Sequence, residues 1–288
     1  MRPSEKDAYR RLLVGWNDRI AQVWDRYYVP AIAPMRERLI DLAEVKTGDR
    51  VLDVCTGTGG AAFSAARRVG KTGRVVGVDT SPKMLRKARG NAAKFGLPTV
   101  EFRLLNSASL DFADGSFDAV VSSFGQPEAP WDRRAGLQEA RRVLVPGGRF
   151  CHCGEADSGS DESSEKFERV FEKVFEKYKV RNPGRELSAT RRLRSLASKE
   201  AKKAPSWGTA LLEDAGFSTV QHFTETFEVT MPARAWLEPS VMWGKLDEYL
   251  AMSPRVRRKF RREAIKAVRP FETTKGPVAF YVALRAKS

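Results

Sequence analysis

Apolar residues along this chain follow two spacings, and these alternate through the first half of the sequence. Short apolar runs, rich in valine and bounded by glycine, aspartate or similar turn residues, are typical of buried strands. They predict five strands, at residues 50–54, 74–78, 99–105, 117–122 and 149–153. Helical spacing lies between them and predicts helices at residues 61–69, 82–95 and 137–144. This alternation is typical of an α/β protein with a doubly wound, mostly parallel sheet.

The regular alternation of strand and helix patterns ends after residue 154. Apolar side chains form one helical stripe over residues 165–178, and a second helical pattern follows at residues 185–203. We interpret residues 155–206 as a helical cap inserted after the fifth strand. Strand and helix patterns then return at residues 207–215, 217–229, 232–252, 254–268 and 278–284. The two further strands among them, at 217–229 and 278–284, bring the expected sheet to seven strands.

The beginning of the chain is helical in pattern. Apolar and aromatic residues recur at helical spacing from residue 8 to residue 44, with interruptions at Pro30 and Pro34. We therefore divide the chain into four parts. They are N-terminal helices at 1–44, a Rossmann-like core at 45–154, the cap at 155–206, and the remainder of the core sheet with a helical insertion on the substrate side at 207–288.

Composition places the chain among soluble globular proteins. It has 288 residues, of which 42% are hydrophobic and 30% charged, and no apolar run reaches the roughly 18 residues of a membrane span. Its first residues show no secretory signal, and three cysteines do not make a disulfide framework, so we expect a cytoplasmic protein. The net charge of +15 favours anionic partners, and both nucleic acid and the surface of an anionic membrane stay open. The same charge also serves solubility alone. The oligomeric state stays open as well.

A glycine-rich turn follows the first predicted strand. Gly57 and Gly59 satisfy the pattern G-x-G-x-x-G/A, which lets the backbone approach a ligand closely at the start of a helix. Asp79 lies 20 residues after Gly59, at the end of the next strand, where an acid can accept hydrogen bonds from ribose hydroxyls. Asp53, just before the turn, would repel the pyrophosphate of a dinucleotide, whereas it would attract a ligand with ammonium and sulfonium groups.

Four segments carry a family resemblance. They are VLDVCTGTG, VVGVDTSPKML, FRLLNSASLDFADGSFDAVVSSFG and ARRVLVPGGRF. In order and spacing they resemble the successive motifs of class I S-adenosylmethionine-dependent methyltransferases, in the branch that contains the ubiquinone/menaquinone methyltransferases. The likeness covers residues 35–153 and is weaker over 207–284. It implies a methyltransferase with S-adenosylmethionine as its cofactor.

The resemblance also implies a role for each matching residue. Gly57 and Gly59 form the turn at the methionine part, Asp53 faces the amino group, and Asp79, with Thr80 beside it, binds the ribose. Met84, Asn106 and Ser107 contact the adenine, and Ser123 ends the fourth strand near the reactive methyl group. The N-terminal helices fold over the cofactor in this family. The full set of expected cofactor-binding residues is Asp53, Gly57, Gly59, Asp79, Thr80, Met84, Asn106, Ser107 and Ser123.

The sequence departs from the family at two places. Cys55 stands where a small residue is usual, and Gln126-Pro127-Glu128 replaces a histidine pair that often follows the fourth strand. An obvious general base is thereby lost. Glu128 and Asp132 are the candidates that remain, with exposed turn acids as the alternative, so no catalytic residue is assigned.

The segment Cys151-His152-Cys153 contains three residues of the types that bind metals. Strand alternation sends His152 to the face opposite both cysteines, and there is no second cluster. We therefore expect core packing and no metal.

Three functions are compatible with these patterns. The favoured one is methyl transfer to a small or lipid-like molecule held under the cap. An RNA acceptor is the second, guided by the basic helices at 185–203 and 254–269, although no RNA-binding module is recognisable. A protein that binds the cofactor without catalysis is the third. The retained Asp53, Gly57, Gly59 and Asp79 argue for cofactor binding in all three.

Overall fold

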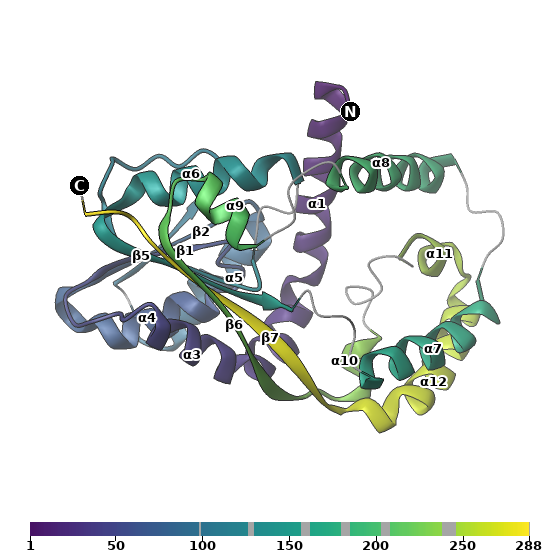
Figure 1. Ribbon diagram of the computed structural model, residues 1–288. Helices are drawn as coiled ribbons and strands as arrows, with labels where there is room; N and C mark the ends of the chain where they lie inside the picture. The colour runs from purple at the N-terminus through teal and green to yellow at the C-terminus, as the bar shows by residue number, and fades with distance from the viewer. Residues whose placement is uncertain are drawn as a thin grey trace.

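A seven-stranded sheet forms the centre of the protein in a computed structural model (Figure 1). The structure describes residues 1–97, 99–125, 130–156, 162–179, 185–202, 208–237 and 246–287. The strands are β1 (Arg50–Val54), β2 (Arg74–Asp79), β3 (Val100–Leu104), β4 (Phe117–Ser123), β5 (Leu144–Glu155), β6 (Ser218–Thr230) and β7 (Thr273–Leu284). Their order across the sheet is β3-β2-β1-β4-β5-β7-β6, and only β7 runs antiparallel to its neighbours. The predicted fold class, a doubly wound and mostly parallel sheet, is confirmed.

Helices cover both faces of the sheet. The helices before β5 are α1 (Pro3–Val23), α2 (Val29–Ala31), α3 (Ala33–Leu42), α4 (Gly60–Val69), α5 (Pro82–Lys94) and α6 (Arg133–Val143). A π-helical turn, η1 (Trp24–Tyr28), follows α1, and 3₁₀ turns lie at η2 (Gly70–Thr72) and η3 (Pro130–Asp132). The later helices are α7 (Glu162–Glu176), α8 (Arg185–Ala201), α9 (Thr209–Asp214), α10 (Ala233–Trp236), α11 (Leu246–Ala251) and α12 (Pro254–Val268), with a 3₁₀ turn η4 (Arg269–Phe271). Among the helices of the described ranges, none is long and apolar enough to cross a bilayer.

The central strands are buried on both faces, which explains their nearly continuous apolar runs. Val51 of β1 pairs with Val75 of β2 on one side and with Ala119 of β4 on the other, and all three are almost inaccessible to solvent. Helices α3, α4 and α5 pack on one face of the sheet, and α6 and α9 pack on the other. Because β1 lies at the centre of this arrangement, the segment that follows it is held in place by buried structure.

Two strands are longer than the hydrophobic pattern predicts. β5 begins at Leu144 rather than at residue 149, and β7 begins at Thr273 rather than at residue 278. β7 pairs with β6 as far as the Thr230–Thr273 pair, so main-chain hydrogen bonding continues beyond the apolar stretch. Side chains along β6 alternate between half-buried and exposed, as expected of a strand at the edge of a sheet.

The helices of the predicted cap pack against different neighbours. α7 lies along α12 at the end of the long β6–β7 ladder (Figure 1), whereas α8 lies beside α1 and η3. Phe260 of α12 is fully buried in a cluster of aromatic rings from α7, α11 and the turn after α7. The rings that contact it belong to Phe171, Phe175, Tyr178 and Tyr249. We call the helices α7, α10, α11 and α12, together with the aromatic residues around Phe260, the outer helical cluster. The division of the chain into four parts stays a prediction.

The outer helical cluster is expected to open independently of the sheet, because its buried residues form a group separate from both sheet cores. Replacing Phe260 by alanine removes a fully buried ring, and we expect the free energy of opening of α7 and α12 to fall by about 3–5 kcal/mol. Hydrogen exchange read by mass spectrometry checks this. Protection of the amides in β1 and β2 should stay as in the wild type. Leu250→Ala serves as the control, because Leu250 is 40% exposed and its loss removes little buried surface. Equal loss of protection in β1 would contradict the expectation.

Candidate functional site

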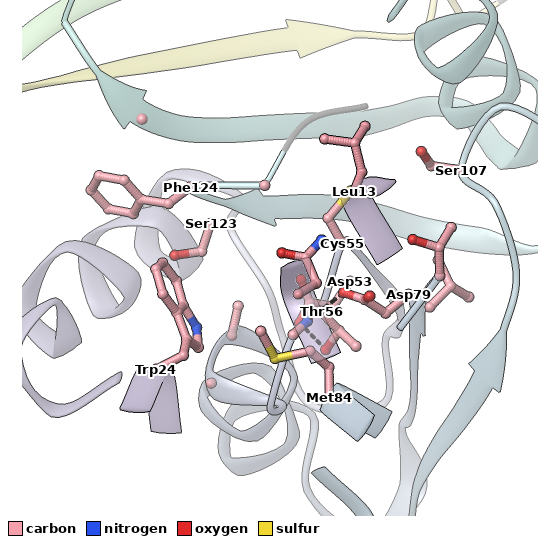
Figure 2. Close-up of a pocket in the computed structure, with 18 of the residues that line it drawn as sticks. Leu13, Trp24, Asp53, Cys55, Thr56, Asp79, Met84, Ser107, Ser123 and Phe124 are labelled. Atoms are coloured by element: carbon pink, nitrogen blue, oxygen red, sulfur yellow. Dashed lines mark hydrogen bonds between the residues drawn. The ribbon is translucent and has the colours of Figure 1, made fainter. Parts of the chain in front are cut away.

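A cavity of about 760 Å³ lies where β1, β2 and β4 end. In a parallel sheet with helices on both faces, ligands bind outside the carboxyl ends of the strands. Residues of the sheet form one wall, and α1 with the turn η1 forms another. Figure 2 shows Asp53, Thr56 and Asp79 grouped together, with Trp24 and Phe124 to one side and Ser107 to the other.

The turn between β1 and α4 places backbone against the cavity. Cys55 and Gly57 both have φ of 56°, and Gly59 has φ of 94°. A Cβ at Gly59 would lie 2.5 Å from the Phe63 ring, so both space and conformation require glycine there. Gly57 lines the cavity, whereas Gly59 does not and instead forms the N-cap of α4. The predicted turn is therefore present, with its two glycines in different roles.

The two carboxylate oxygens of Asp53 differ in their hydrogen bonding within the described part of the chain. Its Oδ2 accepts hydrogen bonds from the Thr56 hydroxyl at 2.6 Å and from the Ala62 N–H at 2.9 Å. Oδ1 is fully buried and accepts no hydrogen bond from the described residues. Burial raises the pKa of Asp53 to about 7; Asp79 adds to this rise, and the two hydrogen bonds and Arg36 oppose it. A buried acceptor of this kind is suited to a cationic donor.

Asp79 joins two loops at the end of β2. Its Oδ2 accepts the N–H of Gly57 at 2.9 Å, and its Oδ1 accepts the N–H of Ser81 at 2.8 Å. Burial raises its pKa, and these backbone hydrogen bonds oppose that rise. Each carboxylate oxygen can accept more than one hydrogen bond, so both retain capacity for a ligand's hydroxyl groups. Thr80 lines the cavity beside it.

The remaining predicted residues also border the cavity, so eight of the nine do, Gly59 being the exception. Met84 is 4% exposed and packs with residues of α1. The side-chain oxygen of Asn106 accepts the N–H of Ala108 at 2.9 Å, which uses part of its accepting capacity. Ser107 is buried nearby, and Ser123 lies 3.7 Å from the Cys153 thiol at the end of β4.

Hydrogen bonds connect α1 to the first residues of α5. Asp18 accepts hydrogen bonds from the Ser81 hydroxyl at 2.6 Å and from the Lys83 N–H at 3.0 Å. Beyond α1, in η1, the rings of Trp24 and Tyr28 stack with centroids 5.0 Å apart, and both line the cavity. A π-helical turn departs from the 3.6-residue spacing, so the position of these two rings at the cavity does not follow from the helical pattern of the sequence.

The candidate bases have different surroundings. Asp132 borders the cavity, and its two oxygens accept hydrogen bonds from Arg10 at 2.9 and 2.7 Å. Glu128 lies outside the described residues. The assignment of a catalytic residue therefore stays open.

His152 and its flanking cysteines face opposite sides of β5. Cys151 and Cys153 are buried with α3 and α4, whereas His152 lies 6.1 Å, ring to ring, from Tyr281 on the other face and borders the cavity. Burial lowers the pKa of His152 to about 3 and raises the pKa of each thiol to about 12. An imidazole on the face opposite the two thiols fits core packing better than metal binding.

Comparisons with known proteins agree with this geometry. Residues 33–236 match the model of the ubiE/COQ5 methyltransferase family. Aklanonic acid methyltransferase DauC of Streptomyces sp. (strain C5) is 33% identical over 146 residues, which are 51% of this chain and 66% of DauC. Nocamycin O-methyltransferase of Saccharothrix syringae is 40% identical over 133 residues, which are 46% of this chain and 47% of that enzyme. The matches thus span between about half and two thirds of the length of these relatives.

Among solved structures, the [4+2]-cyclase SpnF has a TM-score of 0.52 at 18% identity, over 90% of this chain and 82% of its own. At that identity the likeness shows the fold alone. The family match, in contrast, covers well over half of the chain and confirms the resemblance expected from the four motifs. The chain belongs to the ubiE/COQ5 methyltransferase family.

Proposed function

We propose that this protein transfers a methyl group from S-adenosylmethionine to a small-molecule acceptor bound in the same cavity. The observation that carries the proposal is a pair of carboxylates, the buried Asp53 and the half-buried Asp79, at the ends of two neighbouring strands. When bound, S-adenosylmethionine supplies a methyl group on a positively charged sulfur. Asp53, with its open Oδ1, accepts from the ammonium group, and Asp79 accepts from the ribose hydroxyls.

Other residues of the cavity support the two ends of the cofactor. Gly57 keeps backbone close to the methionine part, and Gly59 holds the turn in shape. Thr80 stands beside the ribose site, while Met84, Asn106 and Ser107 form the adenine site. Ser123 ends β4 on the methionine side of the cavity. These roles follow the family pattern, residue by residue, and the cavity brings the side chains within reach of one ligand.

The acceptor is a small molecule in this proposal, and a lipid-like one falls within the same class. Two relatives are named for methyl transfer to aklanonic acid and to nocamycin. The wall opposite the carboxylates is largely apolar, with Leu13, Trp16, Ile20 and Trp24. In-line transfer needs alignment of the reacting atoms and exclusion of water, and these side chains can provide both. The free cysteines agree with a cytoplasmic location for the enzyme, which is part of the proposal.

The first prediction concerns the identity of the cofactor. S-adenosylhomocysteine should bind more tightly than NADH, because Asp53 would repel a pyrophosphate and attract an ammonium group. Isothermal titration calorimetry with both ligands makes the comparison. Tighter binding of NADH would contradict the proposed function.

The second prediction concerns Asp79. Asp79→Ala should weaken binding of S-adenosylhomocysteine tenfold or more, since a hydrogen bond to a charged group contributes about 1.5–3 kcal/mol. Asp79→Asn separates the charge from the side-chain volume, and circular dichroism confirms folding of each variant. Asp41→Ala is the matched control, because Asp41 is an exposed acid that pairs with Arg68 away from the cavity. Unchanged affinity in both Asp79 variants would exclude the ribose role.

The third prediction uses the raised pKa of Asp53. At pH 6.5 this group is largely protonated in the free protein, because its pKa is about 7. An ammonium group favours the carboxylate, so binding should release a proton, and affinity should rise from pH 6 to pH 8. Calorimetry in two buffers of different ionisation enthalpy measures the release. Asp53→Asn should abolish it, and a wild-type heat independent of the buffer would contradict the assignment.

A further inference from the structure

The helix α12 carries a row of positive charge along its exposed face. Lysines and arginines recur there every three or four residues, and we call them the basic stripe: Arg255, Arg258, Lys259, Arg262, Lys266 and, just after the helix, Arg269. At 3.6 residues per turn, this spacing places all six side chains within an arc of about 100°. Phe260, Ala264 and Val268 lie on the opposite side of the helix, buried in the outer helical cluster.

The charges of the basic stripe are not neutralised by neighbouring acids. No ion pair among the described residues involves any of its six side chains. Glu263 is the single acid of α12, and it pairs with Lys177 and accepts a hydrogen bond from the Tyr178 hydroxyl at 2.6 Å. An exposed arginine of α4 has a different environment, since Arg67 pairs with Glu37 at 2.9 Å. Six exposed cations therefore share one helix face without a counter-charge from the described chain.

This arrangement is unfavourable for the helix by itself. Side chains three and four residues apart are neighbours on a helix, so the cations of the stripe repel one another. Arg255 also lies in the first turn of α12, which holds no acid, although the helix dipole favours acids there. An extended surface of negative charge beside α12 would relieve both effects, and the attraction would act on all six side chains together.

The position of the stripe suits contact with an extended surface. Its residues, 255–269, span about 21 Å along one helix at 1.5 Å per residue. Figure 1 shows α12 at the margin of the molecule, at the end of the β6–β7 ladder. None of the six residues borders the cavity at the strand ends, so contact along the stripe leaves that cavity's walls intact.

The composition of the outer helical cluster favours lipid over nucleic acid as the negative partner. Single-stranded nucleic acids are bound largely through bases that stack on accessible aromatic rings. The rings of this cluster instead pack inward against Phe260. A group of about four to eight lysines and arginines on an amphipathic helix is typical of proteins that bind anionic lipids.

We propose that the basic stripe of α12 docks this protein on the surface of a membrane that contains anionic phospholipids. The cations meet the lipid phosphate groups, while the buried face of α12 keeps its contacts in the outer helical cluster. The inference goes beyond the proposed function and does not depend on it, because docking requires neither the cofactor nor the acceptor.

Co-sedimentation of the full chain with vesicles tests the proposal. One set of vesicles is phosphatidylcholine alone, and the other contains phosphatidylcholine with phosphatidylglycerol in a ratio of about 7 to 3. At about 0.1 M salt we expect the wild type to bind the anionic vesicles about tenfold or more tightly, since every cation near the surface adds to the attraction. At about 0.5 M salt this preference should fall to within about twofold, because salt screens exposed charges.

A fourfold variant removes the centre of the stripe: Arg258→Gln, Lys259→Gln, Arg262→Gln and Lys266→Gln. Its preference for anionic vesicles should fall to within about twofold at the lower salt concentration. The matched control loses two exposed arginines and two exposed lysines from α1, α5 and the segments before β1 and β2: Arg19→Gln, Arg86→Gln, Lys46→Gln and Lys71→Gln. It has the same net charge as the first variant and should keep the preference of the wild type. Circular dichroism checks the folding of both.

Three results would overturn the proposal. The first is equal binding of the wild type to the two kinds of vesicle, a comparison that needs no variant. The second is an equal loss of preference in the control variant, because net charge would then account for binding. The third is displacement from the vesicles by an oligouridine of about 20 nucleotides that binds through the same four side chains, which would identify nucleic acid as the partner. Binding of S-adenosylhomocysteine, measured in parallel, tests the proposed function separately.

Discussion

The hydrogen bond from the Gly57 N–H to Asp79 connects two of the segments that border the cavity. It joins the turn after β1 to the end of β2, and the second oxygen of the same carboxylate holds the Ser81 N–H. Ser81 in turn caps α5 and donates to Asp18 of α1. One half-buried side chain therefore links two strand ends and, through Ser81, the helix α1 that forms another wall of the cavity.

The strands that carry the two carboxylates belong to the buried centre of the sheet. β1 lies between β2 and β4 and is buried on both faces, so its end is as rigid as the core. Burial also gives Asp53 and Asp79 their electrostatic character, since a carboxylate removed from water gains most from a cation or a donor supplied by a ligand. Rigid strands thus give the cavity both its geometry and its affinity for positive charge.

Local patterns predicted the central strands and the turn that border the cavity. The five central strands, the glycine turn and Asp79 all follow from residues that are close together in sequence, and eight of the nine expected residues border the cavity. The full length of β7 could not be predicted from its own residues, because it depends on pairing with β6, which is remote along the chain. The burial of Arg36 could not be predicted locally, because an arginine in a helix usually faces solvent and this one packs over Gly60, the first residue of α4. The packing positions of α7 and α8 likewise depend on contacts with α12 and α1, which are remote from them along the chain.

The separation of the outer helical cluster from the sheet also bears on how such enzymes diversify. Its buried residues, centred on Phe260, are distinct from those of the two sheet cores, and the β6–β7 ladder runs directly into it (Figure 1). Substitutions within the cluster can be compensated locally, without shifting the strand ends that carry Asp53 and Asp79. The two regions are therefore free to change at different evolutionary rates, so that descendants of one ancestor can acquire new outer helices and keep an old pocket at the strand ends.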